Sequence, residues 1–278
     1  MTISFMFFSL LTGVSVFTLM SLRTIPYQAT GPRFFRLIFL LCFLLFFPFL
    51  PFHPFDTFRI PFRIATDFSS LIALVHIAFL IYCALLAVLF VLYFRKTPSP
   101  LVFKLTILVG ILSLFLEGLL YRPSGGTVWW ENIIIPLSFM SGAFLVGSSL
   151  FAMMLGHWYL VQFDLDKKLL KRVSLLFSVA LALRIVTTLS GLLLFSKSGH
   201  INPDYFHSIF ALNGHGIFFW MRVIIGFALP LMLAYMIYET ARLGANQSCT
   251  GLLYIAVVFV FMGEMVSRYV FFLKGIPL

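Results

Sequence analysis

Eight apolar segments, each long enough to cross a lipid bilayer, dominate this sequence of 278 residues. A transmembrane helix needs about 20 predominantly apolar residues, and a soluble domain carries about 25% charged residues. Here only 10% of the residues are charged. We therefore expect an all-α integral membrane protein, a bundle of about eight transmembrane helices that forms a single domain over 1–278. The expected spans are 3–22, 34–52, 70–94, 101–121, 133–163, 173–196, 215–241 and 251–273.

Basic residues divide unevenly between the two sets of loops that these spans define. One set holds Arg23, Arg33, Arg36, Arg95, Lys96, Lys104, Lys167, Lys168, Lys171, Arg172 and Arg242, and the other holds Arg59, Arg63, Arg122, Lys197 and Lys274. Because the basic loops of membrane proteins face the cytoplasm, we expect both termini outside. The first span has no preceding Lys or Arg and no small-residue cleavage site after it, which favours a retained helix over a signal peptide.

The formal net charge of +10 has the same origin. A strongly basic soluble protein would suggest nucleic acid as a partner, but no basic helix or interleaved aromatic surface supports that here. We expect no nucleic-acid binding, and the partner that the charge pattern indicates is the membrane lipid.

Ionisable residues inside the spans are the candidates for function, because a charge in the bilayer costs several kcal/mol unless it is paired or hydrated. Five of them, from four different spans, fall in the outer half of the membrane. We expect these five to face the interior of the bundle. They are His76, Glu117, Arg222, Glu264 and Arg268.

Glu264 and Arg268 are spaced i, i+4 and so share one face of their helix. They form either a structural pair that neutralises itself or a protonatable carboxylate tuned by a cation. Quinol oxidation releases two protons, and a buried Glu beside a polar cavity can accept one. Glu117 is an alternative acceptor. Arg222 can pair with either Glu or donate a hydrogen bond to a quinone carbonyl.

Haem b requires two axial histidines at equal depth on facing helices. His76 lies in the outer half and His157 near the inner end of its span, so their depths differ, whereas His76 with His215 is conceivable. The three cysteines are Cys42, Cys83 and Cys249, with no CxxC pair. We therefore expect no iron–sulfur cluster or structural zinc held by this chain alone.

Two segments resemble a known family. Gly263–Phe272 reads GEMVSRYVFF, and it is similar to the last helix of the membrane anchors of dimethyl-sulfoxide reductases, where Gly-Glu is followed by Arg and an aromatic-rich exit. Phe219–Val223 reads FWMRV and resembles their preceding helix, which carries Trp-Arg before an apolar run. Eight spans with both termini outside also match that family, which belongs to the wider polysulfide-reductase and NrfD-like group.

The resemblance implies a multi-pass subunit of a bacterial or archaeal cytoplasmic membrane that binds menaquinone or ubiquinone. Such a subunit passes electrons between the quinone pool and an iron–sulfur subunit at the outer face, which serves a catalytic subunit with molybdenum. By this resemblance Glu264, Arg268 and Arg222 are the site candidates. We expect Glu264, with Glu117 as an alternative relay, to carry the proton chemistry, and Arg268, Arg222, His76 and Trp220 to bind the quinone. The chain would be a quinol-oxidising or non-catalytic subunit with no metal of its own.

Two other functions stay open. One is a haem b cytochrome subunit, with ligands drawn from His76, His157 and His215. The other is a non-redox transporter or assembly scaffold. If the quinone interpretation holds, Glu264→Gln should abolish quinol oxidation and leave the complex assembled, whereas loss of assembly would indicate a structural ion pair.

Overall fold

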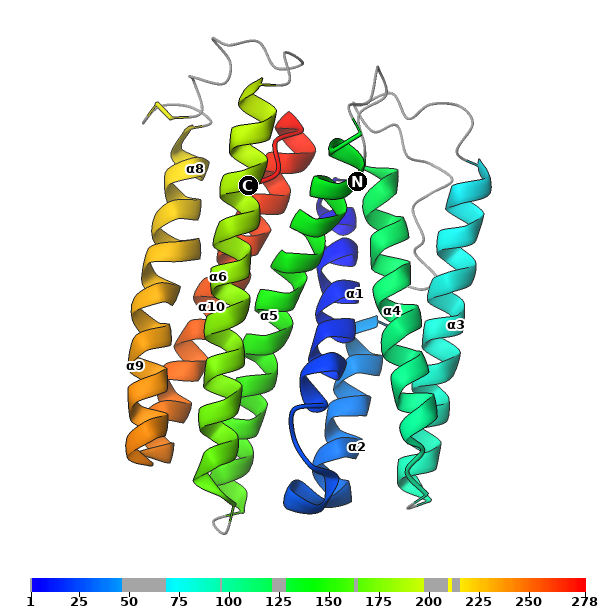
Figure 1. The fold of residues 1–278 in the computed structure, drawn as a ribbon, viewed down its shortest axis with the longest axis vertical. Coiled ribbons are helices and arrows are strands. Elements are labelled where there is room, and N and C mark those ends of the chain that lie inside the picture. The colour runs from blue at the N-terminus through cyan, green and yellow to red at the C-terminus, as the bar shows by residue number, and fades with distance from the viewer. Residues whose placement is uncertain are drawn as a thin grey trace.

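The computed structural model describes residues 2–46, 69–95, 97–121, 129–162, 165–197, 210–211 and 216–278. These residues form a bundle of roughly parallel and antiparallel helices (Figure 1), and no strand occurs in the described ranges. The helices are α1 (Thr2–Leu22), α2 (Tyr27–Phe46), α3 (Ser69–Phe94), α4 (Pro100–Leu120), α5 (Glu131–Val161), α6 (Lys167–Lys197), α8 (Gly216–Val223), the π-helix η3 (Ile224–Ala228), α9 (Leu229–Leu243) and α10 (Asn246–Lys274).

Seven helical segments in the described part are long and apolar enough to cross a membrane, and α8, η3 and α9 together make one of them. The helix α1 adds a further apolar segment, with Met6–Leu22 as its searched part. The chain is therefore a multi-pass helical membrane protein. Both termini lie at the same end of the bundle, the upper end in Figure 1.

The expected spans match these helices with one clear difference. The second helix begins at Tyr27 rather than near residue 34. A short helical piece precedes Gly31, the chain turns sharply there, and the helix continues from Pro32. Gly31 has φ 74° and ψ 175°, which glycine alone adopts readily. The expected outer end of this span, residues 47–52, lies outside the described residues.

Helix ends follow local sequence signals. Ser99 caps α4 by accepting a hydrogen bond from the Val102 N–H at 3.4 Å, and Pro100 takes the first helical position, where no N–H is needed. The helix α9 ends at Gly244 in the left-handed conformation with φ 76°. The helix α10 also ends at a glycine in the left-handed conformation, Gly275, after which the chain turns back into the bundle.

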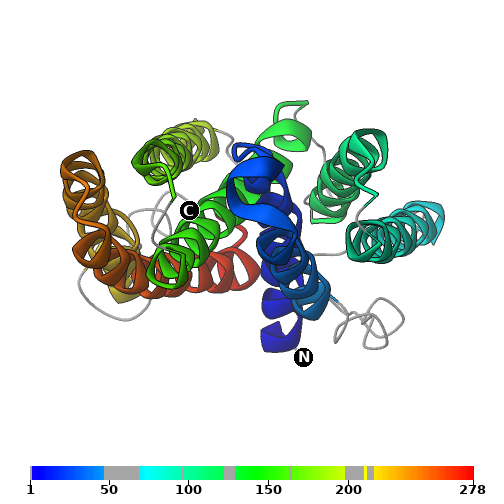
Figure 2. The ribbon, with the colours of Figure 1, turned by 90° about the horizontal axis from the view of Figure 1, so that it is seen from below.

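The helix α5 is the centre of the bundle and packs against α1, α4, α6 and α10. Figure 2 shows this arrangement from below, with α3 and α4 on one side and α9 on the other. Small residues on α5 allow the close contacts. A Cβ atom on Gly147 would lie 2.9 Å from the Phe17 side chain of α1, so a larger residue there would push the two helices apart.

Candidate functional site

Five charged side chains meet in the interior of the bundle, and we call them the charge cluster: Glu117, Arg184, Arg222, Glu264 and Arg268. They come from α4, α6, α8 and α10, and each is at most 4% exposed. The cluster contains three guanidinium groups and two carboxylates, so these five residues carry one excess positive charge when all are ionised. In the bilayer such a charge needs internal hydrogen-bond partners, because water cannot supply them.

Glu264 is held by arginines from two other helices. Arg184 donates from Nε to Oε1 at 2.9 Å and from Nη2 to Oε2 at 3.1 Å, which is a two-point contact that fixes both groups in one plane. Arg222 donates from Nη2 to Oε1 at 2.5 Å. Gly142 of α5 makes room for the carboxylate, since a Cβ atom there would collide with Oε2.

The remaining N–H groups of Arg184 also bind acceptors. Its Nη1 donates to the Ser138 carbonyl at 3.0 Å and to the Ser138 hydroxyl at 2.9 Å, both on α5. Its Nη2 donates to the Ser267 hydroxyl at 2.8 Å and to the Leu278 backbone oxygen at 2.5 Å. The Ser267 hydroxyl donates to the same Leu278 oxygen. One guanidinium therefore ties α5, α6, α10 and the segment after α10 together.

Arg268 and Glu117 form a second part of the cluster. The Tyr121 hydroxyl donates to Glu117 Oε1 at 2.7 Å. Arg268 donates to the Ser9 hydroxyl at 2.8 Å and to the Phe139 carbonyl at 3.2 Å, and its guanidinium lies 4.1 Å from the centre of the Phe139 ring. Between these residues is a cavity of about 10 Å³, the size of one water molecule.

Arg222 differs from the other two arginines. Among the described residues, its Nε and Nη1 atoms are buried without a hydrogen-bond partner, and its guanidinium lies 4.2 Å from the centre of the Phe227 ring. It sits where α8 passes into η3, and π-helical turns are frequent at functional sites. A Cβ atom on Gly263 would lie 2.9 Å from Arg222 Nη1 and 2.4 Å from the Gly226 Cα, so only glycine permits this close packing.

The structure brings four of the predicted site residues together and leaves two apart. Glu117, Arg222, Glu264 and Arg268 all belong to the charge cluster. His76 of α3 bonds through Nδ1 to the Ile72 carbonyl within its own helix at 2.9 Å. Trp220 of α8 donates to the Phe210 carbonyl at 3.1 Å and is 37% exposed.

Arg184 is the cluster residue that the sequence did not assign to the site. Its position near the middle of a span was the available signal, because a charge at that depth must find a partner. Its partner Glu264 is 80 residues away in sequence, so no helical spacing could identify the pair.

Of the predicted haem ligands, His76 and His157 do not form a matching pair. His76 lies in the first third of α3 and His157 near the end of α5, and in Figure 1 these parts of the two helices are at opposite ends of the bundle. His157 Nδ1 is 3.0 Å from the Tyr254 hydroxyl of α10. His215 lies outside the described residues. Within the described part, no group of three or more His, Cys, Asp or Glu residues could hold a metal ion.

No protein-family model matches this chain, and no curated protein matches it in sequence.

Proposed function

We propose that this protein is the quinone-interacting membrane anchor subunit of a respiratory oxidoreductase complex, which passes electrons between the quinone pool and an iron–sulfur partner subunit. The observation that carries the proposal is the pair of buried N–H groups on Arg222 without a partner in the described structure. A buried donor without an acceptor costs about 1–3 kcal/mol. A quinone carbonyl is an acceptor that reaches this depth from the lipid.

The quinone ring would approach from the lipid on the side of α8 and η3. Ile224 and Trp220, each two positions from Arg222 in the sequence, are exposed on that side of the bundle. Arg222 itself is fully buried against Gly226 and Gly263. Ring binding therefore requires η3 to move away from α10, and π-helical turns of this kind are frequent at functional sites.

The contacts of the two glutamates favour a division of roles. Two guanidinium groups donate three hydrogen bonds to Glu264, which stabilises its ionised form and makes it a poor proton acceptor. Glu117 accepts one from the neutral Tyr121 hydroxyl and lines the water-sized cavity. We therefore assign proton acceptance to Glu117 rather than to Glu264, and give Glu264 the task of positioning Arg222.

The partners follow from the resemblance of the last two spans. An iron–sulfur subunit would dock at the end of the bundle that carries both termini, and a catalytic subunit, with molybdenum in the family that this chain resembles, would receive the electrons. The chain would belong to a bacterial or archaeal cytoplasmic membrane. Its own residues would bind and orient menaquinone or ubiquinone and take up a proton.

The first test is an optical spectrum and a quinone extraction on the gently solubilised native complex. Bound quinone together with iron–sulfur partners and no haem bands would support the proposal. Arg222→Gln should then lower the bound quinone at least tenfold, because it removes the charged donor. The matched control is Arg242→Gln, which changes an exposed arginine of α9 that pairs with Glu239. Equal quinone content in both variants would contradict the role of Arg222.

A second candidate function is a non-redox assembly scaffold or transporter, and the closed packing of the charge cluster favours it. The cavity between Glu117 and Arg268 holds about 10 Å³, far less than a quinone ring. In that case the charged residues would only stabilise the packing of the helices, and the native complex would contain neither quinone nor a redox partner. Haem bands assigned to this chain would instead favour the haem b cytochrome.

A further inference from the structure

An apolar groove lies on the outside of the bundle between α6 and α9, two helices that pack side by side (Figure 2). Its volume is about 570 Å³. Leu181 and Ala234 form the floor, because they are 1% and 7% exposed. The other lining residues, most of them exposed, are Leu175, Ser178, Ala182, Ile185, Val186, Leu231, Tyr235 and Tyr238.

The groove has about the length of one lipid leaflet. Val186 lies eleven positions after Leu175 on α6, which is about 16 Å at the helical rise of 1.5 Å per residue. Half of the hydrocarbon core of a bilayer is about 15 Å thick. An acyl chain therefore fits along the groove. Since lipid tails are as apolar as leucine, the groove alone would not select one lipid over another.

Two lysines of α6 reach across to α9 at the end of the groove that lies away from the termini. Lys171 is four residues before Leu175, and its Nζ lies 5.7 Å from the centre of the Tyr238 ring. Lys167 is four residues earlier still, and a Cβ atom on Gly244 would lie 3.0 Å from its Nζ. Because residues four apart share one helix face, both ammonium groups belong to the face of α6 that lines the groove.

The charges of these two lysines are not neutralised by the described part of the chain. No ion pair of Lys167 or Lys171 with a carboxylate occurs there. Glu239 of α9 is paired with Arg242 of its own helix at 2.6 Å. Asp166 accepts a hydrogen bond from the Lys168 N–H at 3.0 Å, at the start of α6. The end of the groove therefore has positive charge available for an anion.

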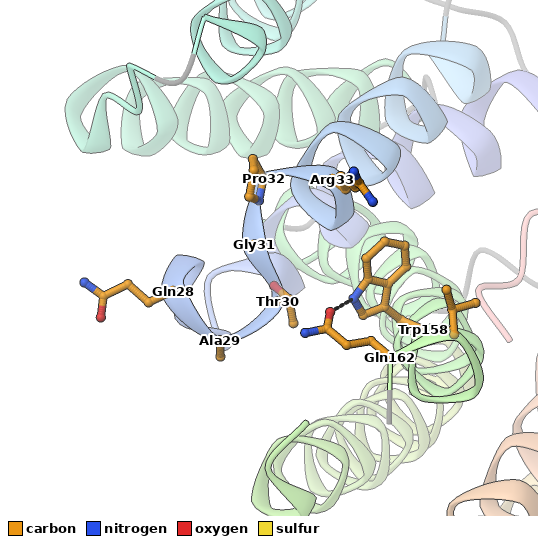
Figure 3. Close-up of a pocket in the computed structure, with 9 residues that line it drawn as sticks. Gln28, Ala29, Thr30, Gly31, Pro32, Arg33, Trp158 and Gln162 are labelled. Carbon is orange, nitrogen blue, oxygen red and sulfur yellow. Dashed lines mark hydrogen bonds between the residues drawn. The ribbon is translucent and has the colours of Figure 1, made fainter. Parts of the chain in front are cut away.

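A different cavity at the same end of the bundle provides a comparison (Figure 3). It lies between the start of α2 and the end of α5 and has a volume of about 460 Å³. Arg33 is the only basic residue among the described residues that line it, and Gln28 and Gln162 make its walls partly polar. It does not combine a long apolar wall with two cations, so we expect no retained lipid there.

We propose that the groove between α6 and α9 holds one acyl chain of an anionic phospholipid, whose headgroup phosphate lies against Lys171 and Lys167. The basic loops predict that this end of the bundle faces the cytoplasm. Basic residues next to the membrane surface attract anionic lipids. The groove shares no residue with the charge cluster, so this proposal does not depend on the quinone proposal.

The test uses the full chain, purified in a neutral detergent and studied by native mass spectrometry. Dioleoyl phosphatidylglycerol, which carries a negative charge, is compared with dioleoyl phosphatidylcholine, which has the same acyl chains and no net charge. Lys171→Gln and Lys167→Gln each remove one cation from the end of the groove. Ala182→Phe fills the groove at an exposed position, so the packing of the bundle should not change.

Three matched controls change the same properties elsewhere. Lys104→Gln removes an exposed lysine near the start of α4, at the same end of the bundle. Arg33→Gln removes the cation of the other cavity (Figure 3). Val179→Phe adds bulk to an exposed residue of α6 that does not line the groove.

We expect the wild type and the three controls to retain phosphatidylglycerol over phosphatidylcholine. Lys171→Gln and Lys167→Gln should each lose about fivefold of that preference, the factor for one basic residue near an anionic headgroup. Ala182→Phe should lower the retention of phosphatidylglycerol by a similar factor.

Three results would overturn the proposal. The first is equal retention of the two lipids by the wild type. The second is the same loss in Lys104→Gln as in Lys171→Gln, which would indicate a general attraction to the basic end of the bundle. The third is unchanged retention in Ala182→Phe, which would place the acyl chain outside the groove.

Discussion

Arg184 and Glu264 form a two-point ion pair in the membrane interior, with Nε–Oε1 and Nη2–Oε2 distances of 2.9 Å and 3.1 Å. Arg222 donates a third hydrogen bond to the same carboxylate from the next span. Glu264 is therefore the common anion of two cations on different helices. Its carboxylate thereby links α6, α8 and α10.

Removing the charge of Glu264 should destabilise the fold. In Glu264→Gln two buried guanidinium groups would face a neutral amide, and breaking a buried ion pair from one side costs about 3–5 kcal/mol. We expect a clearly lower thermal midpoint by circular dichroism in mild detergent, and a reduced yield of assembled complex. This replaces the sequence-based expectation that the variant stays assembled.

The control for that variant is Glu239→Gln. Glu239 pairs with Arg242 at 2.6 Å on the exposed surface of α9, and exposed pairs contribute about 1 kcal/mol or less. We expect its midpoint to stay near that of the wild type. If Glu264→Gln were equally stable, the ion pair would have no structural role.

Gly142 should tolerate no side chain. A Cβ atom there would collide with Glu264 Oε2 and would lie 3.3 Å from Arg184 Nε, so Gly142→Ala has to break the two-point contact or move α5. We expect a loss of about 1–3 kcal/mol in unfolding free energy, the usual range for overpacking. Gly251→Ala is the matched control, since nothing lies within 4 Å of its added Cβ. There we expect no loss or a gain of about 0.5–1 kcal/mol, and equal effects at both positions would contradict the packing argument.

Glu117→Gln should lower the rate of quinol oxidation without unfolding the helix bundle. The amide oxygen can still accept the hydrogen bond from Tyr121, so the helices should remain packed. If Glu117 accepts the proton, quinol oxidation by the assembled complex should fall about 10²–10⁴-fold with the bound quinone unchanged. Glu239→Gln, on the exposed face of α9, serves as the control for activity. Full activity in Glu117→Gln would remove Glu117 from the proton path.

The orientation in the membrane is testable with two single cysteines. Thr97 lies exposed in the turn between α3 and α4, and Trp129 is 73% exposed just before α5 at the other end of the bundle. If basic loops face the cytoplasm, a membrane-impermeant maleimide should label Trp129→Cys in intact cells and Thr97→Cys only after permeabilisation. The reverse pattern would invert the topology.

The class of fold follows from the low charge content and the length of the apolar runs. A chain so poor in charge and so rich in long apolar runs has to satisfy its backbone within helices, because lipid offers no hydrogen bonds. The helix limits at Ser99, Gly244 and Gly275 also follow from local capping chemistry. The helical piece before Gly31 was not predicted, because it lies outside the apolar run by which the span was identified.

The pairing of the buried charges was decided only by the tertiary structure. The cost of a charge in lipid indicates that Glu117, Arg222, Glu264 and Arg268 face inward, but it does not say which of them meet. The spacing of Glu264 and Arg268 suggested a pair, yet the hydrogen bonds of Glu264 go to Arg184 and Arg222, and those of Arg268 go to Ser9 and Phe139. The rotation of each helix about its axis sets these contacts, and that rotation results from the packing of α5 against its neighbours rather than from any local pattern.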